Sequence, residues 1–195
     1  MTALDGTAVR GAVTALCDLL GRVPDGTAAV PVMGTSVTAV AQHLVSCLAW
    51  YAHDLAAGPD EVSSADLVAC PAAYLRTVSR GVGAWGEVLA RTVDAAGPAD
   101  RGWHPHGVAD AAGFAAIGCA EVLVHGTDVA DALGLSWSPP GDVAAAVLAR
   151  LFPRVTDVPD PMAGLLWATG RLALPGQPQR TSWQYAMAPP ERVQA

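Results

Sequence analysis

The sequence lacks lysine and asparagine altogether, and it is poor in charged and aromatic residues. Charged residues make up 15% of its 195 positions and aromatic residues 6%, whereas hydrophobic residues make up 52%. Intrinsic disorder requires low hydrophobicity and high net charge, so this composition excludes a disordered chain. All 11 basic residues are arginines, against 18 acidic residues, and the net charge of -7 excludes a basic nucleic-acid-binding surface.

Long, uninterrupted hydrophobic runs are also missing, although the mean hydropathy is positive at +0.33. Residues 26–53 form the longest stretch without Asp, Glu or Arg, and this stretch is long enough to cross a bilayer. It contains Pro31, Gln42 and His43, however, and polar atoms at mid-depth in a bilayer are costly. The N-terminus shows no basic region ahead of an apolar core, so we expect a cytoplasmic protein with no signal peptide and no membrane partner. The positive hydropathy then predicts an apolar pocket, a dimer interface or both.

Cysteine is scarce and widely spaced. Cys17, Cys47, Cys70 and Cys119 form no CxxC pair and no zinc-ribbon spacing. Each lies within an apolar pattern that we interpret as helical, and a free cysteine in such a setting packs as a small hydrophobic residue. We therefore expect all four thiols to be buried and inert.

The chain consists of helical patterns separated by glycine and proline. We predict helices over residues 4–20, 36–57, 65–96, 108–133, 142–152 and 162–169. Thr35 or Ser36 caps the second and Ser64 the third, in which Pro71 is early enough to be tolerated or to cause a kink. No apolar–polar alternation is sustained enough to predict a strand. The pattern predicts one all-α domain: a four-helix bundle over about residues 4–134, then short C-terminal helices and an irregular tail over 135–195.

Three polar residues interrupt the apolar fourth helix. Glu121, His125 and Asp128 occupy positions i, i+4 and i+7 and therefore share one helix face. Glu121 is one of only four glutamates in the chain, and its flanks are almost entirely apolar. A carboxylate and an imidazole at i and i+4 can bind one metal ion. The same spacing is also consistent with an exposed polar stripe or with a buried Glu–His hydrogen bond that binds no metal.

His43, in the second predicted helix, could supply a third metal ligand. The second and fourth helices of a bundle can face each other across the core, where bundle metal sites are built. The alternative is a core histidine that is hydrogen-bonded and binds no metal. Two histidines and one carboxylate would leave coordination positions open, as in catalytic metal sites.

Three segments together resemble a known family. TSVTAVAQHL, AEVLVHGTDVADALG and LLWATGRLALPG resemble successive motifs of the DinB-like helical metalloenzymes, most of all the mycothiol-dependent maleylpyruvate isomerase type, which is abundant in actinobacteria. The resemblance covers about residues 5–175. It implies a four-helix bundle that often dimerises, here as a homodimer, with His43, Glu121 and His125 binding zinc, nickel or another divalent ion. Asp128 matches the acidic residue that follows the last ligand of the family.

The same resemblance implies an enzyme that activates a thiol, such as mycothiol, for a transferase or isomerase reaction on a small-molecule substrate. Two features depart from the family: Thr35-Ser36 stands where Trp-Thr is usual, and the residues after about Pro140 are too few for the isomerase type's separate C-terminal domain. We therefore expect a different pocket and do not expect maleylpyruvate as the substrate. The alternatives are a thiol-independent tailoring enzyme, catalysing isomerisation, cyclisation or hydrolysis, and a non-catalytic metal-binding bundle.

Further residues are candidates for catalysis or substrate binding. Asp128 could orient His125 or accept a proton. Arg80, together with Arg76 one turn earlier, could hold an anionic substrate. A solvated helix face is the favoured alternative, because Glu87 and Arg91 continue that side as a plausible surface pair.

The loop before the fourth helix and the last motif supply the remaining candidates. His104 and His106 of the WHPHG segment could border the metal site or lie on the surface. Arg171 could face a ligand or cap a helix end. The tryptophans at positions 50, 85, 103, 167 and 183 could line an apolar pocket, although most should belong to the core or an interface.

Overall fold

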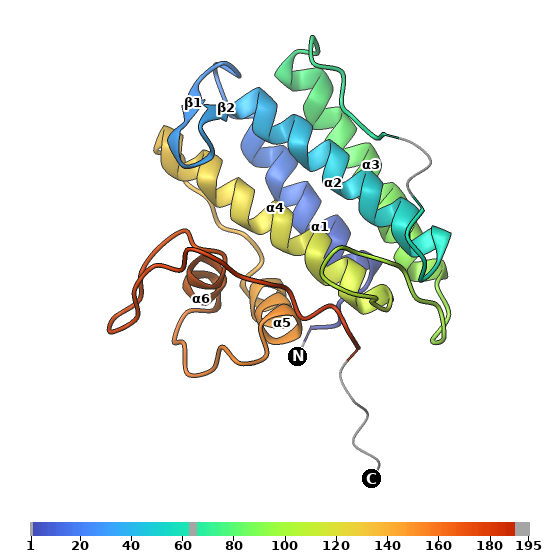
Figure 1. The fold of residues 1–195 in the computed structure, drawn as a ribbon. Helices are drawn as coiled ribbons and strands as arrows, with labels where there is room; N and C mark the ends of the chain where they lie inside the picture. The colour runs from blue at the N-terminus through green and yellow to red at the C-terminus, as the bar shows by residue number, and fades with distance from the viewer. Residues whose placement is uncertain (1, 63–65, 190–195) are drawn as a thin grey trace.

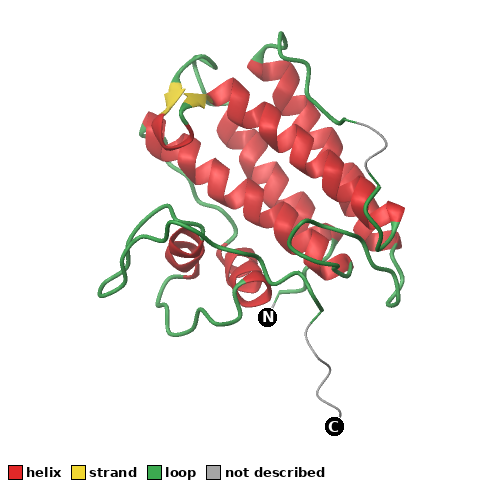
Figure 2. Cartoon of the chain, in the orientation of Figure 1, coloured by secondary structure: helices red, strands yellow, loops and turns green. Residues whose placement is uncertain are grey.

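The protein is mostly helical in the computed structural model, which describes residues 2–62 and 66–189 (Figures 1 and 2). Within that part the α-helices are α1 (Gly6–Leu20), α2 (Val37–Ala57), α3 (Leu75–Ala95), α4 (Ala111–Leu133), α5 (Gly141–Leu151) and α6 (Pro161–Ala168). A short antiparallel hairpin, β1 (Ala29–Val30) and β2 (Thr35–Ser36), is the one sheet in the same residues. The prediction of an all-α chain is confirmed. None of the described helices combines the length and apolar character needed to cross a membrane.

Side-chain caps determine where the main helices begin. Asp5, Ser36 and Asp110 each accept a hydrogen bond from a first-turn amide of α1, α2 and α4, respectively. The α4 helix ends at Gly134, whose φ of 61° is the left-handed conformation that glycine adopts most easily. The predicted cap of α2 at Ser36 is confirmed, and α4 begins three residues later than predicted because Asp110 is its cap.

The predicted start of the third helix is wrong. The α3 helix begins at Leu75 instead of residue 65, and residues 66–74 contain no helix. The predicted cap, Ser64, lies outside the described residues. Pro71 has no amide hydrogen and its ring clashes with a preceding helical turn, so a helix through this position is disfavoured. Cys70 lies in this segment and is exposed, which corrects the prediction that it is buried in a helix; of the four cysteines only Cys119 is fully buried.

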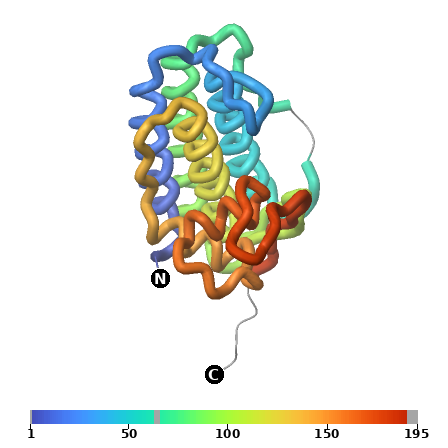
Figure 3. Tube along the Cα trace, turned by 90° about the vertical axis from the view of Figure 1, so that its left-hand side faces the viewer, coloured from blue at the N-terminus to red at the C-terminus, as the bar shows by residue number. Residues whose placement is uncertain are grey.

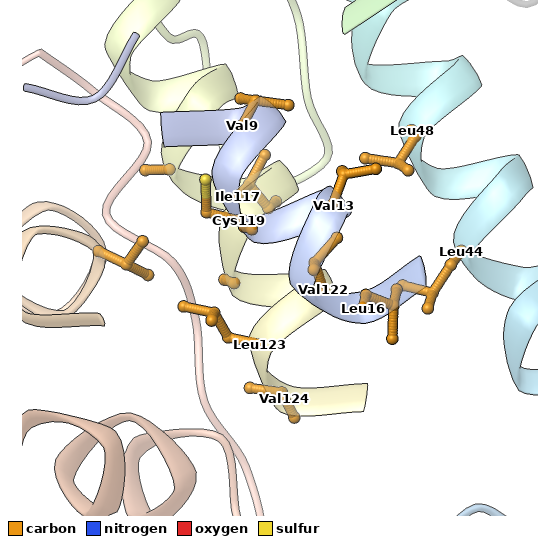
Figure 4. Close-up of a cluster of buried hydrophobic side chains, with 14 of the residues drawn as sticks. Val9, Val13, Leu16, Leu44, Leu48, Ile117, Cys119, Val122, Leu123 and Val124 are labelled. Carbon is orange, nitrogen blue, oxygen red and sulfur yellow. The ribbon is translucent and has the colours of Figure 1, made fainter. Parts of the chain in front are cut away.

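The four long helices, α1 to α4, lie side by side, and α5 and α6 pack beside α4 (Figures 1 and 3). The α4 helix is the most enclosed of them, with 16 of its 23 residues buried. Apolar side chains of α1, α2 and α4 meet in the core shown in Figure 4, including those of Val13, Leu16, Leu44, Leu48 and Ile117. Burial of each such side chain contributes about 1.5–3 kcal/mol. His125 and Asp128 of α4 are likewise buried in protein.

The C-terminal segment after α6 is irregular, as predicted, but it is held against α5. The Ala186 amide donates to the Leu151 carbonyl, and Arg150 donates to the carbonyls of Ala186 and Met187. The Met187 side chain is fully buried. These contacts tie residues 185–187 to the helical body.

The loop between α3 and α4 is anchored at Gly102, where replacement by alanine should be destabilising. An added Cβ would lie 2.7 Å from both the Asp54 carbonyl oxygen and the Leu55 Cα. Because these are backbone atoms, we expect Gly102→Ala to lower the free energy of unfolding by about 1–3 kcal/mol in denaturant titrations. Gly11→Ala in α1 is the matched control, since nothing lies within 4 Å of its added Cβ. It should stabilise the protein by about 0.5–1 kcal/mol, and equal effects of the two changes would contradict the prediction.

Candidate metal centre

Three potential metal ligands converge where α2 packs against α4. Glu121 Oε2 lies 3.4 Å from His43 Nε2 and 3.2 Å from His125 Nε2. The two imidazole rings are 5.0 Å apart and nearly perpendicular, at 88°. Among residues 2–62 and 66–189, this is the one group of three or more His, Cys, Asp or Glu side chains whose ligand atoms all lie within 4.8 Å of one another. The structure thus brings together the three residues predicted from sequence, and the group could hold a metal ion.

The donor set suits a borderline divalent ion such as zinc. Zinc takes imidazole nitrogen and carboxylate oxygen at about 2.0–2.2 Å, and tetrahedral geometry then separates neighbouring ligand atoms by about 3.3–3.5 Å. The two Glu121 distances are close to this separation without any movement of the helices. The His43 side chain is 45% exposed, whereas those of Glu121 and His125 are 13% and 7% exposed. An ion bound here would therefore be reached from the His43 side.

A buried ion-pair network orients His125. Its Nδ1 atom lies 2.9 Å from Asp128 Oδ2, which leaves Nε2 to face Glu121. Arg171 donates from Nε and Nη2 to the two Asp128 carboxylate oxygens at 3.2 Å, and from Nη1 to the Thr169 carbonyl. A carboxylate behind a ligating histidine fixes the ring and its tautomer. These contacts suit the orienting role, one of the two predicted for Asp128, and they join Arg171 to the site through Asp128.

Electrostatics within the cluster favour its charged forms. Burial acts to lower the pKa of His125, but the contacts with Asp128 and Glu121 outweigh this effect and raise the pKa to about 9. Burial acts to raise the pKa of Glu121, and the two histidines outweigh it and hold that pKa well below its ordinary value. The same balance, with His125 and Arg171 as partners, lowers the pKa of Asp128. A divalent ion must displace a proton from this network, so metal binding should weaken at low pH.

Cys47 borders the cluster, a contact that was not predicted from the sequence. Its Sγ atom lies 3.4 Å from His43 Nε2 and 4.0 Å from Glu121 Oε2. Burial raises the pKa of the Cys47 thiol well above its ordinary value, which keeps it protonated at neutral pH. The spacing of His43 and Cys47, one turn apart on α2, was the available signal.

A cavity of about 430 Å³ opens beside His43 and Cys47. Its walls come from α2, from residues 61–62 and from the loop before α4. The lining residues are His43, Ser46, Cys47, Trp50, Tyr51, Asp54, Glu61, Val62, Trp103, His104 and Pro105. A larger hollow of about 710 Å³, between the end of α2, α3 and the following loop, contains none of the three potential ligands. The cavity at His43 is therefore in position to present a small molecule to a bound ion.

The remaining predicted substrate-binding residues lie elsewhere. Arg80 is exposed on α3, and the described hydrogen bonds and ion pairs do not connect it to the metal-site cluster. The predicted Glu87–Arg91 surface pair is present at 2.7 Å, and Glu87 is shared with Arg10 of α1. His106 accepts a hydrogen bond at Nδ1 from the Tyr185 amide, so it anchors the C-terminal segment. Substrate binding by Arg80 or His106 stays a prediction.

His104 is buried on the cavity wall, and its titration should make folding pH-dependent. Burial, and then the neighbouring His106, lower the pKa of His104 from 6.5 to about 4. As the pH falls from about 6.5 towards 4, the unfolded chain takes up this proton before the folded one, so stability present above pH 6.5 is lost, on the order of 1–3 kcal/mol.

The His104 contribution is measurable as the difference between wild type and His104→Asn in urea unfolding at about pH 7 and about pH 4.5. Asparagine cannot titrate but retains an acceptor for the His106 amide, which donates to His104 Nδ1 at 3.1 Å. The wild type should lose more stability than the variant between the two conditions. Equal losses would contradict the prediction.

Comparisons with known proteins add no relative: no family model matches this chain, and neither a curated protein nor a solved structure matches it. The resemblance to DinB-like metalloenzymes therefore depends on the three sequence motifs. The candidate site depends on the geometry of His43, Glu121 and His125.

Proposed function

We propose that this chain is a cytoplasmic, divalent-metal-dependent enzyme of the DinB-like class, with α1 to α4 as its four-helix bundle. The convergence of His43, Glu121 and His125, beside a cavity open to small molecules, is the observation that supports this proposal. Zinc suits the two nitrogens and one oxygen best, and nickel or another divalent ion is the alternative. With three protein ligands, one or more coordination positions stay open for a reactant.

A bound zinc ion would act as a Lewis acid that favours the deprotonated form of a thiol or a water molecule at neutral pH. The surrounding residues divide the other tasks. Asp128, itself held by Arg171, keeps the His125 ring oriented, and the exposed His43 marks the side from which a reactant enters. The aromatic cavity walls would position the second reactant and exclude water.

Within this class we propose a thiol-dependent transferase or isomerase, with mycothiol as the cosubstrate and a homodimer as the working state. The motif resemblance supports the thiol, and the positive mean hydropathy supports a dimer interface. A thiol-independent tailoring enzyme is the second candidate. It is favoured by the position of Cys47, whose own sulfur occupies space next to His43 and Glu121.

Metal analysis tests the proposal first. Protein purified without chelator should carry one divalent ion per chain, and added Zn²⁺ should stabilise the chelated protein against thermal unfolding. Absence of metal, together with stability that ignores Zn²⁺ and Ni²⁺, would refute both enzymatic candidates and leave a non-catalytic bundle.

Calorimetric titration with mycothiol then separates the two enzymatic candidates. Heat that requires the metal-loaded protein would support the thiol-dependent enzyme. A metal-loaded protein that gives no heat would favour the tailoring enzyme. Light scattering gives the oligomeric state in the same samples.

A further inference from the structure

Away from His43, the described lining of the cavity beside the metal centre carries charge of one sign. Two carboxylates, Asp54 and Glu61, belong to its described lining, and no arginine is among those residues. The Asp54 side chain is only 12% exposed and lies 2.9 Å from His53 Nδ1. His104 supplies no positive charge at neutral pH, because burial lowers its pKa to about 4. Apart from an ion bound at His43, an anionic ligand would meet no lining cation here, whereas a cationic ligand would meet two carboxylates.

The other walls are aromatic and held in place by their neighbours. The Trp50 ring meets His53 edge-on at 5.2 Å, and the Tyr51 ring lies 5.8 Å from the His104 ring. The loop residue Trp103 donates its backbone amide to the Gly58 carbonyl, which fixes it beside the end of α2. Aromatic walls attract flat apolar rings, and they attract cations through the negative charge on the ring faces.

The cavity also runs along one face of α2. His43, Cys47, Trp50, Tyr51 and Asp54 follow one another at helical spacing along the same face of that helix. The eleven residue steps from His43 to Asp54 correspond to about 16 Å of helix rise. His43 of the metal centre therefore lies at one end of this helix face and Asp54 at the other, with Trp50 and Tyr51 between them.

We propose that this cavity binds an elongated aromatic amine in its protonated form. The ring lies against Trp50 and Trp103, the ammonium group faces Asp54 and Glu61, and the opposite end reaches His43. The inference deepens the proposed function by naming the substrate class of the same site, but the charge preference itself does not require a bound metal. Near Asp54 and Glu61, an anionic group of a substrate would be disfavoured.

Three probes that share a phenyl ring and a two-carbon chain test this charge preference. Phenethylamine, phenethyl alcohol and phenylethanesulfonate differ in charge, and the sulfonate is a weak metal ligand. In calorimetric titrations of the full chain at low ionic strength, the amine should bind at least about tenfold more tightly than the sulfonate, with the alcohol between them. Equal affinities, tighter binding of the sulfonate, or no binding of the amine would overturn the proposal.

Charge-removing variants show whether the preference arises in this cavity. The double variant Asp54→Asn/Glu61→Gln should reduce the amine-to-sulfonate ratio to within about threefold. Glu61→Gln alone, at an exposed position, should reduce it part of the way and covers the case in which the double variant does not fold. Asp60→Asn is the matched control, since Asp60 is exposed next to Glu61 but does not line the cavity. A ratio that falls as much in the control as in Glu61→Gln would overturn the assignment.

The same titrations on His125→Ala, which lacks one metal ligand, separate this inference from the proposed function. The variant should keep the charge preference, because that preference does not require a bound metal. If the wild-type protein binds no metal but still prefers the amine, the metal-dependent enzyme is refuted and the amine site is retained. A metal-loaded wild type without the preference would refute the amine site and retain the metal centre.

Discussion

Replacing His43 with alanine is expected to remove the bound divalent ion while leaving the fold intact. The His43 side chain is 45% exposed, so its truncation removes a ligand without opening a cavity in the core. Two donors, Glu121 and His125, would remain, and we expect metal affinity to fall at least about 100-fold, more than the loss of an outer-shell partner produces. Competition with a chromogenic chelator and elemental analysis of the purified protein measure this effect.

His53→Ala is the control for this experiment. His53 lies on the same helix, but it pairs with Asp54 and does not belong to the metal-binding group. It should retain one ion per chain, and both variants should unfold at similar temperatures in the presence of chelator. Full metal content in His43→Ala would show that the ligand set is wrong.

Removal of the Asp128 carboxylate is expected to cause the largest loss of stability in the site. Asp128 is 4% exposed and pairs with both His125 and Arg171, whose side chain is 16% exposed. Asp128→Ala leaves the Arg171 guanidinium without its carboxylate partner in the interior, which should cost about 3–5 kcal/mol in denaturant unfolding. Asp128→Asn keeps the shape and one acceptor, so it should cost less while still lowering metal affinity about 10–100-fold.

The control for Asp128 lies one turn further along α4. Asp131 is exposed, and Asp131→Ala should change the free energy of unfolding by no more than about 0.5 kcal/mol. If Asp128→Ala were as mild as this control, the ion pair with Arg171 would have no structural importance. The effect of Asp128→Ala on metal content would then be the remaining test of an orienting role for Asp128.

Much of the secondary structure was predictable from short stretches of sequence. The caps at Ser36 and Gly134 act on amides and carbonyls within one helical turn, so residue type alone locates those ends. The prediction failed for α3, where apolar residues on both sides of Pro71 suggested one continuous stripe. Tyr74, which lies between Pro71 and the start of α3, is 85% exposed. An apolar pattern shows what could be buried, but it does not show whether another element is present to cover it.

Part of the candidate site could also be predicted, because it depends on residues within a single helix. Glu121, His125 and Asp128 lie within two turns of one helix, and their common face follows from helix geometry. The participation of His43 needed the further assumption that α2 and α4 are neighbours, which the structure confirms at 3.4 Å from Glu121. The contact between Cys47 and the cluster was not predicted. Cys47 has mostly apolar neighbours in the sequence, whereas in the folded chain it lies next to His43 and Glu121.

Local sequence therefore specified the helical class, most helix ends and the i, i+4 pairing of Glu121 with His125, since these depend on interactions within a few residues. Contacts between distant segments decided the rest. Arg171, which follows α6, reaches Asp128 across 43 positions of sequence, and the WHPHG loop folds back to wall the cavity beside α2. Such contacts depend on how helices pack, and no short pattern encodes that packing because it follows from the burial of apolar surface throughout the chain.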